Sequence, residues 1–217
     1  MSGMRRSTIT GIVVSTLVVV TAAAWLYNGE GPAAAGGNPA PEPLHGVLWP
    51  EPLELAGFEL TTQTGDIFTE ESFAGQWDLV FFGYIDCPDI CPMSLASMRQ
   101  MRNILARRGR EVGQPRYIFV SVDSENDNPE RMRQYLDAFD PEFIGLTGAK
   151  AMIDRLAESL AVHYRKVPED DFNTIDHTSS LMIIDPGGRA VGAMQPPLVP
   201  ERMAEIFEEL ADSFPKY

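Results

Sequence analysis

The clustering and spacing of apolar residues along the chain predict a mixed α/β domain. Continuous apolar runs cover Leu79–Tyr84 and Tyr117–Val122, as expected for strands that are buried on both faces. Apolar residues at helical spacing follow each run, up to about Arg108 after the first and from Pro129 to about Phe139 after the second. The order strand, helix, strand predicts a βαβ unit with two parallel strands.

Shorter segments on both sides of this unit complete the predicted sheet. A Thr-Gly-Asp turn at residues 64–66, flanked by apolar residues, predicts a small hairpin before the unit. After the unit, the pattern predicts a helix at about 148–160, strands at 162–167, 181–184 and 190–194, and a last helix at about 201–212. This order is the plan of a thioredoxin-like fold, an α/β mixed sheet flanked by helices.

An uncharged apolar segment lies at the N-terminus. The length of this run, residues 9–27, is close to the roughly 20 apolar residues that a helix needs to cross a bilayer. Arg5 and Arg6 precede the segment, and this arrangement directs residues 28 onward out of the cytoplasm. We predict that residues 1–27 form an N-terminal transmembrane anchor. A cleaved secretory signal is the alternative, and it would export the domain equally.

The remaining chain divides by composition into a tether and one domain. Residues 28–52 are dense in Gly, Pro and Ala, which predicts a flexible tether, and residues 53–217 are enough for one globular domain. The whole chain holds 17 basic and 31 acidic residues, for a net charge of −14. A surface this acidic is unsuited to phosphate backbones and argues against a nucleic-acid partner.

Two cysteines, Cys87 and Cys91, are the candidate reactive groups. They follow a predicted buried strand and stand where a helix begins, and a helix N-terminus stabilises a thiolate. Pro92 suits the first position of that helix, which makes Cys91 the predicted N-cap. Asp86 is expected to act the other way and raise the thiol pKa, because it is a neighbouring carboxylate.

The spacing of the cysteines favours a metal site over the alternatives. Three residues separate them, where the thioredoxin redox motif has two, and this leaves room for both sulfurs to face one metal ion. Two inert buried cysteines, or a structural disulfide that closes a very short loop, are the plain alternatives.

A third ligand must come from elsewhere, and His177 is the candidate. It precedes a predicted strand in the region where a thioredoxin-like sheet brings a loop beside the cysteines, and Asp176 next to it is a candidate for orienting the ring. His45 lies in the predicted tether and His163 in a predicted strand.

Two thiolates select Cu(I), and an added imidazole also admits Cu(II). Zinc usually prefers four ligands in closed sites. Methionine ligands are a further possibility, although most of these residues fall at core spacing: Met93, Met98, Met101 and Met203.

Four segments together resemble the Sco/SenC family of membrane-tethered copper proteins. They are FFGYIDCPDICP (81–92), VSVDSENDNPE (120–130), YLDAFDPEFIGLTG (135–148) and DHTSSLMIIDPGG (176–188). The resemblance covers roughly residues 52–213. This chain departs from the family pattern at Ile85-Asp86, Ser124 and Asn128, none of which is a candidate ligand.

The resemblance implies both a site and a role. It implies one copper ion per chain, Cu(I) or Cu(II), held by Cys87, Cys91 and His177. It also implies a copper chaperone, not an enzyme, that assists assembly of the copper centre of cytochrome c oxidase. The expected partners are a copper donor protein and the copper-receiving subunit of the oxidase or of another copper enzyme. The expected location is the inner membrane, with a single pass and the C-terminal domain in the periplasm.

A thiol–disulfide oxidoreductase is the alternative function. Cys87 and Cys91 would then be a redox-active pair that keeps the partner's copper-ligand cysteines reduced. Reductases of this fold place a Pro on the loop that faces the cysteines, whereas residues 169–185 contain none and carry His177 there. This difference favours metal binding.

Overall fold

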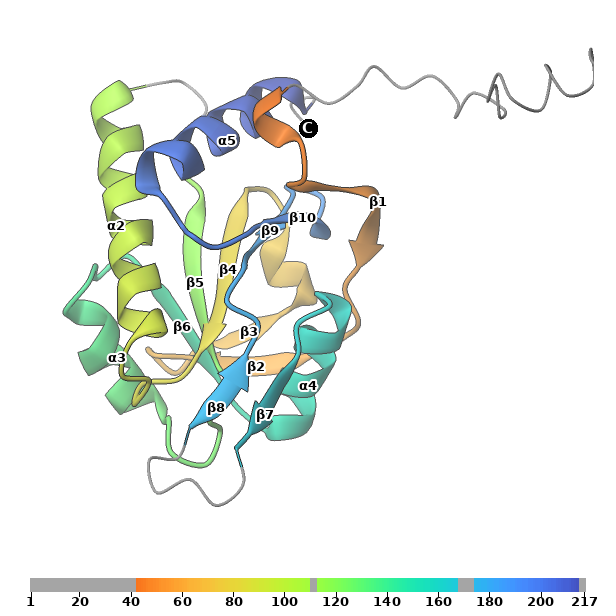
Figure 1. Ribbon diagram of the computed structural model, residues 1–217. Coiled ribbons are helices and arrows are strands. Elements are labelled where there is room, and N and C mark those ends of the chain that lie inside the picture. The colour runs from red at the N-terminus through yellow and green to blue at the C-terminus, as the bar shows by residue number, and fades with distance from the viewer. Residues whose placement is uncertain (1–41, 110–112, 168–173, 215–217) are drawn as a thin grey trace, which may run out of the picture. The chain divides into compact units, whose positions relative to one another are not determined.

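The apolar runs pair into a mixed eight-stranded sheet in the computed structural model of the protein, which describes residues 42–109, 113–167 and 174–214 (Figure 1). The strand order is β1-β10-β9-β4-β5-β6-β2-β3. The strands of this sheet are β1 (Leu48–Glu54), β2 (Glu59–Thr62), β3 (Ile67–Thr69), β4 (Asp78–Gly83), β5 (Arg116–Ser121), β6 (Ile144–Thr147), β9 (Leu181–Ile184) and β10 (Arg189–Met194). A separate two-stranded antiparallel sheet consists of β7 (Tyr164–Lys166) and β8 (Ile175–His177).

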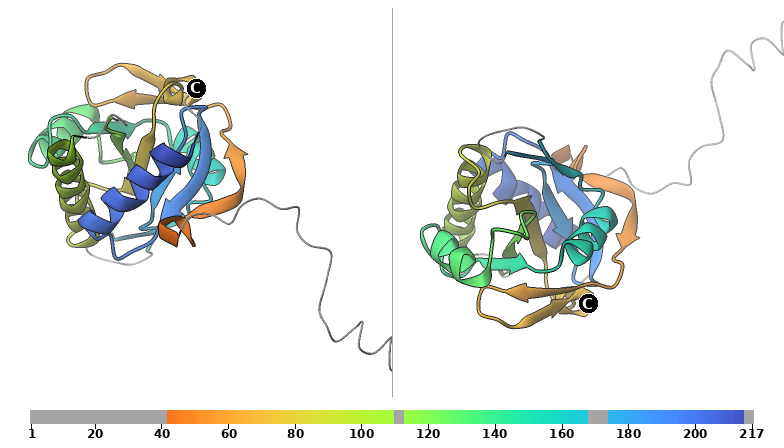
Figure 2. Two further views of the ribbon diagram at one scale, coloured as in Figure 1. Left: turned by 90° about the horizontal axis from the view of Figure 1, so that it is seen from above. Right: turned by 90° about the horizontal axis from the view of Figure 1, so that it is seen from below.

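Helices cover both faces of the main sheet. They are α2 (Ile90–Arg108), α3 (Pro129–Asp137), α4 (Lys150–Ser159) and α5 (Pro200–Ser213), with short 3-10 turns η1 (Glu42–Leu44) and η2 (Glu70–Phe73). Helices α2 and α5 pack against each other, and α4 lies on the other side of the sheet from α2 (Figure 2). All six residues of β4 are buried, which agrees with a central strand that is covered on both faces.

The parallel centre of the sheet positions the site. Strand β4 runs parallel to β5, and β5 runs parallel to β6, so the carboxyl ends of all three meet at one edge. The loops that leave this edge are residues 84–89 after β4, residues 122–128 after β5 and residues 148–149 after β6. Loops at the carboxyl ends of parallel strands are the usual place for ligand sites in such sheets.

Most of the predicted elements are confirmed. The hairpin β2–β3, the buried strands β4 and β5, the four helices and the hairpin β9–β10 all appear close to their predicted ranges. Asn128 caps α3 as expected, since its side chain accepts a hydrogen bond of 3.0 Å from the backbone N–H of Arg131.

Strand β1 differs from the prediction. It crosses the predicted boundary between tether and domain, and it pairs with β10 at the edge of the main sheet. Leu44 and Val47, also in the predicted tether, are buried in the core at 1% and 7% exposure. Residues 42–52 therefore fold with the domain. Most of β1 is exposed and it contains two prolines, and an edge strand tolerates both features.

The predicted anchor, residues 1–27, lies outside the described residues, as does the predicted tether up to residue 41. Within the part of the chain that the structure describes, no helix combines the length and the apolar character needed to cross a membrane.

Candidate metal centre

The two cysteines lie where β4 passes into α2. Cys87 is in the loop and is 8% exposed, and Cys91 is in the first turn of α2 and is fully buried. The N-cap of α2 is Asp89 and not Cys91, so the predicted helix start was two residues late. Pro92 is tolerated at the third helical position because the N–H groups of the first turn have no partner within the helix.

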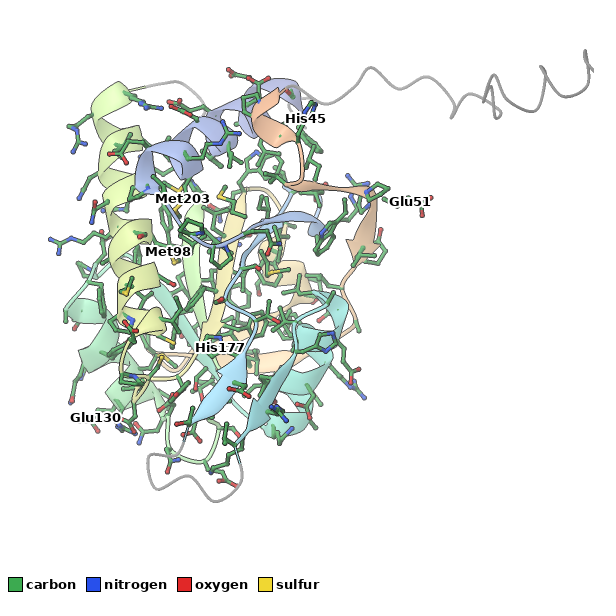
Figure 3. All side chains as sticks on the ribbon, in the orientation of Figure 1. His45, Glu51, Met98, Glu130, His177 and Met203 are labelled. Atoms are coloured by element: carbon green, nitrogen blue, oxygen red, sulfur yellow. The ribbon has the colours of Figure 1, made fainter. Side chains whose placement is uncertain are left out.

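The small sheet brings His177 to the cysteines. His177 ends β8, and its Nε2 lies 3.5 Å from the Sγ of Cys91. The ligand atoms of Cys87, Cys91 and His177 all lie within 4.8 Å of one another, which is close enough for one metal ion. The structure thus brings the three predicted ligands together. His45 lies far from His177 (Figure 3), and exposed His163 is not part of the cluster.

A backbone carbonyl orients the imidazole of His177. Nδ1 lies 3.1 Å from the oxygen of Thr178, and a carbonyl oxygen can only accept, so Nδ1 carries the proton. The lone pair of Nε2 therefore points towards the sulfurs, which is the tautomer that a metal ligand needs. Asp176, the predicted orienting group, instead forms an exposed ion pair of 2.9 Å with Arg165.

Aromatic rings and a glycine complete the walls of the cluster. The rings of Phe81 and Tyr84 stand edge-on to the His177 ring, with centroids at 5.9 and 6.1 Å. Gly83, the last residue of β4, leaves space for Cys91, because a Cβ at position 83 would lie 2.7 Å from the Cys91 Sγ. The close approach of α2 to the end of β4 thus depends on a missing side chain.

Comparison with known proteins identifies the family. The SCO1/SenC family profile matches residues 51–212. The chain belongs to the SCO1/SenC family. A SCO2-like protein of Rickettsia conorii is 32% identical over 171 residues, which cover 76% of this chain and 82% of that protein. The human mitochondrial SCO1 homolog is 35% identical over 140 residues, which cover 64% of this chain and 46% of the human protein.

Solved structures of Sco proteins share the fold. Copper-bound ScoI of Bradyrhizobium japonicum is 37% identical, with a TM-score of 0.62 over 72% of this chain and 99% of that one. Copper-bound ScoI of Arabidopsis thaliana is 27% identical, with a TM-score of 0.67 over 72% of this chain and 98% of that one. The thioredoxin-like mixed α/β fold predicted from the sequence is confirmed.

The two thiols of this SCO1/SenC chain share one proton unequally. A hydrogen bond from Cys91 is the main cause that lowers the pKa of Cys87 to about 3, and backbone hydrogen bonds lower it further, while burial opposes the shift. The same hydrogen bond, together with burial, raises the pKa of Cys91. Both cysteines are free, so the cluster holds a thiolate beside a thiol, and the disulfide considered above is not formed.

Asp86 does not have the predicted effect on the thiols. Its carboxylate forms an ion pair of 2.8 Å with Arg131 of α3, and the pKa of Cys87 is lowered and not raised. Asp86 is not among the main causes that shift the pKa of either cysteine, so the expected raising effect is not seen. A carboxylate that is paired with a guanidinium acts less strongly on a third group.

We expect one thiolate per metal-free chain across the mildly acidic range. Because the pKa of Cys87 is lowered, its thiolate should persist as the pH falls from neutrality and be lost only near about pH 3. The far-ultraviolet absorbance of the thiolate, followed during acid titration of the metal-free protein, measures this. In Cys87→Ser the acid-stable absorbance should be absent. A transition near the ordinary thiol pKa of about 8.5 in the wild type would contradict the expectation.

Asp127 is a site residue that the sequence analysis missed. It is 2% exposed, and its Oδ2 accepts hydrogen bonds from the Ile85 backbone N–H at 3.0 Å and from the Ser121 hydroxyl at 2.6 Å. This carboxylate thus ties the cysteine loop to the end of β5. Burial raises the pKa of Asp127. An acidic residue in the loop after a buried strand was the available signal, but only the fold shows that it holds the cysteine loop.

The methionines are mainly core residues, as their spacing predicted. Met98, Met101 and Met203 are exposed by 2% or less. Met93 differs, because it is 60% exposed on the first turn of α2.

Proposed function

We propose that this SCO1/SenC protein is a copper chaperone that carries one copper ion on Cys87, Cys91 and His177. The observation that carries the proposal is the convergence of two sulfurs and one imidazole nitrogen within 4.8 Å. Two thiolates favour Cu(I), and the imidazole extends the site to Cu(II). The relatives from Bradyrhizobium japonicum and Arabidopsis thaliana, whose structures contain copper, support the same cargo for this chain.

The geometry suits delivery better than permanent storage. Three ligands leave coordination positions open to an incoming donor atom, whereas a closed structural zinc site has four protein ligands. Cys91 is fully buried, while His177 is half-buried and lies on a short peripheral hairpin. A partner's thiolate or imidazole would therefore approach from the His177 side and replace the ligands one at a time.

The proposed client is the copper centre of cytochrome c oxidase. The likeness of four sequence segments to the Sco/SenC family supports this client, with a copper donor protein and the copper-receiving subunit as partners. We place the domain in the periplasm, held at the inner membrane by residues 1–27. The uncharged run at 9–27, preceded by Arg5 and Arg6, supports this location.

Copper reconstitution of the full-length protein in detergent tests the binding site. The wild type should bind one copper per chain and show thiolate-to-Cu(II) charge-transfer absorption. His177→Ala should lose that absorption and bind Cu(II) more weakly by more than the roughly 10–100-fold that follows loss of an outer partner of a ligand. His163→Ala is the matched control, because His163 is an exposed histidine at the start of the same hairpin.

The same variants test the client in cells. In a strain that lacks this protein, oxidase activity in the membranes should fall, and it should return with the wild type or His163→Ala but not with His177→Ala. Unchanged stoichiometry and spectrum in His177→Ala would refute the site. Full oxidase activity without the protein would refute the client.

A thiol–disulfide reductase is the second candidate, favoured by the thiolate–thiol pair. The Cys87 thiolate would attack a partner disulfide and form a mixed disulfide, and Cys91 would then displace the partner. This leaves a Cys87–Cys91 disulfide and two partner thiols, and an external dithiol must restore the pair. Equal and fast reduction of a model disulfide by metal-free wild type and by His177→Ala would favour this role.

A further inference from the structure

The strand that carries His177 has little support from sheet pairing. Within the described residues, β8 pairs only with β7, neither strand is hydrogen-bonded into the eight-stranded sheet, and Ile175 is the core residue of β8. An isolated two-stranded hairpin is marginally stable in water. The position of His177 therefore depends on contacts that tie this hairpin to the rest of the domain.

One tie lies directly across the hairpin from His177. Tyr164 of β7 is the residue paired with His177 in the antiparallel register. Residues directly opposite in such a pair have Cβ atoms about 5 Å apart, so a shift of one backbone moves the other. The ring of His177 follows its backbone, because Nδ1 is bonded to the oxygen of the next residue, Thr178.

A polar network fixes Tyr164 to α4. The Tyr164 hydroxyl donates a hydrogen bond to Oδ1 of Asp154. Lys150 donates to both carboxylate oxygens of Asp154, at 2.8 and 2.9 Å, and its Nζ lies 3.4 Å from the Tyr164 hydroxyl. The same ammonium sits 5.1 Å from the centre of the Tyr164 ring. Three groups therefore hold one another in a single arrangement.

Helix α4 is a firm base for this network. Ile153, Leu156 and Ala157 of α4 are in the core, at 2% exposure or less. The backbone N–H of Val162 bonds the Ala157 oxygen at 2.8 Å, which fixes the chain between α4 and β7. The hairpin has other contacts away from α4. Lys166 forms an exposed ion pair of 3.4 Å with Glu125, and the His177 ring of β8 packs on Phe81 and Tyr84.

We propose that Tyr164, held by Asp154 and Lys150, is a positioning residue for His177. It acts through the backbone register and does not touch the metal. The proposal rests on the copper site proposed above. It adds the network of Tyr164, Asp154 and Lys150 to the three ligands as a determinant of Cu(II) affinity. An exposed Lys–Asp pair alone contributes little, so the connection to Tyr164 gives this cluster its effect.

Tyr164→Phe tests the proposal in the full-length protein, because it removes only the hydroxyl. We expect Cu(II) affinity, measured by chelator competition, to fall roughly 10-fold, as for loss of an outer partner of a ligand. The charge-transfer absorption should weaken, in the direction of its loss in His177→Ala. In the metal-free protein, the NMR signal of the His177 ring should broaden or shift. Asp154→Ala should reproduce these changes. Asp154→Asn keeps an oxygen that accepts the Tyr164 hydrogen bond, so this variant should behave nearly like the wild type.

Tyr117→Phe is the matched control. Tyr117 is at the opposite end of β5 from the site, and its hydroxyl makes one bond of 3.4 Å to Gln114. It should leave copper binding and the His177 signal unchanged. The melting temperature should fall no further in Tyr164→Phe than in Tyr117→Phe.

The outcomes separate this proposal from the proposed function. If His177→Ala loses Cu(II) while Tyr164→Phe and Asp154→Ala match the wild type, the positioning role is overturned and the copper site stands. If the wild type binds no copper, the proposed function fails, and the His177 signal of the metal-free variants still decides the positioning role. If Tyr164→Phe does not fold, the two Asp154 variants give the answer.

Discussion

Replacing Cys91 by serine is expected to abolish stoichiometric copper binding by the full-length protein. Cys91 is fully buried, and its Sγ lies 3.5 Å from the Nε2 of His177, so it is the innermost of the three donor atoms. A serine hydroxyl is a hard, neutral oxygen that binds Cu(I) poorly, whereas a thiolate is the soft donor that Cu(I) prefers. We expect Cu(I) affinity to fall by at least about 100-fold, measured by competition with a chelator.

The serine variant separates two effects of Cys91. A serine hydroxyl can still donate a hydrogen bond to Cys87, so the thiolate of Cys87 is retained while the second sulfur ligand is lost. Met98→Leu is the control, because it removes a buried sulfur from the same helix at nearly constant volume. Stoichiometric Cu(I) on Cys91→Ser, or its loss from Met98→Leu, would show that a different sulfur binds the metal.

Gly83→Ala is expected to damage the fold and the site together. The added Cβ would lie 2.7 Å from the Cys91 Sγ and 2.9 Å from the Phe119 ring. Gly83 and Phe119 lie on adjacent central strands, and Cys91 is in the helix packed above them, so no flexible side-chain end can move aside. Overpacking of this kind costs about 1–3 kcal/mol of unfolding free energy, and α2 must move away from β4.

Urea unfolding and copper titration of the same preparation measure both effects. The loss of copper affinity in Gly83→Ala should exceed what the loss of stability alone explains, because the displaced atom is a ligand. Gly57→Ala is the control: the nearest atom to its Cβ would be a Glu70 carboxylate oxygen, at 2.9 Å, at the end of a flexible side chain. If Gly83→Ala matched Gly57→Ala in both measurements, the close packing of Cys91 on β4 would not matter for copper.

The parts of the fold that could be predicted are those with a strong local signal. Strand β4 is a continuous apolar run, and Asn128 before Pro129 is an N-cap signal, so both were found close to their observed positions. Strand β1 has prolines and exposed side chains, and β6 and β8 have four and three residues. Segments this short have no measurable periodicity, so only their partners in the sheet define them.

The three ligands of the candidate site could be predicted, but the residues that hold them in position could not. Residue type, spacing and the family resemblance pointed to Cys87, Cys91 and His177, and the fold brings them together. The groups that hold these ligands were not visible, because they act across distant segments. Asp127 reaches back 42 residues to the Ile85 backbone, and Tyr164 matters only through its register with His177. Such partners are set by the tertiary structure, and the spacing of residues along one sequence does not reveal them.

The ligands lie on two separate parts of the domain, and this has a mechanical consequence. Cys91 belongs to the main framework and His177 to the small hairpin, and these two residues are 86 positions apart in the chain. A bound metal ion is therefore a cross-link that fastens the hairpin to the body of the domain, and a cross-link between distant positions restricts the chain strongly. In the proposed delivery role, release of the ion removes this cross-link and leaves the packing of the main sheet and its helices in place.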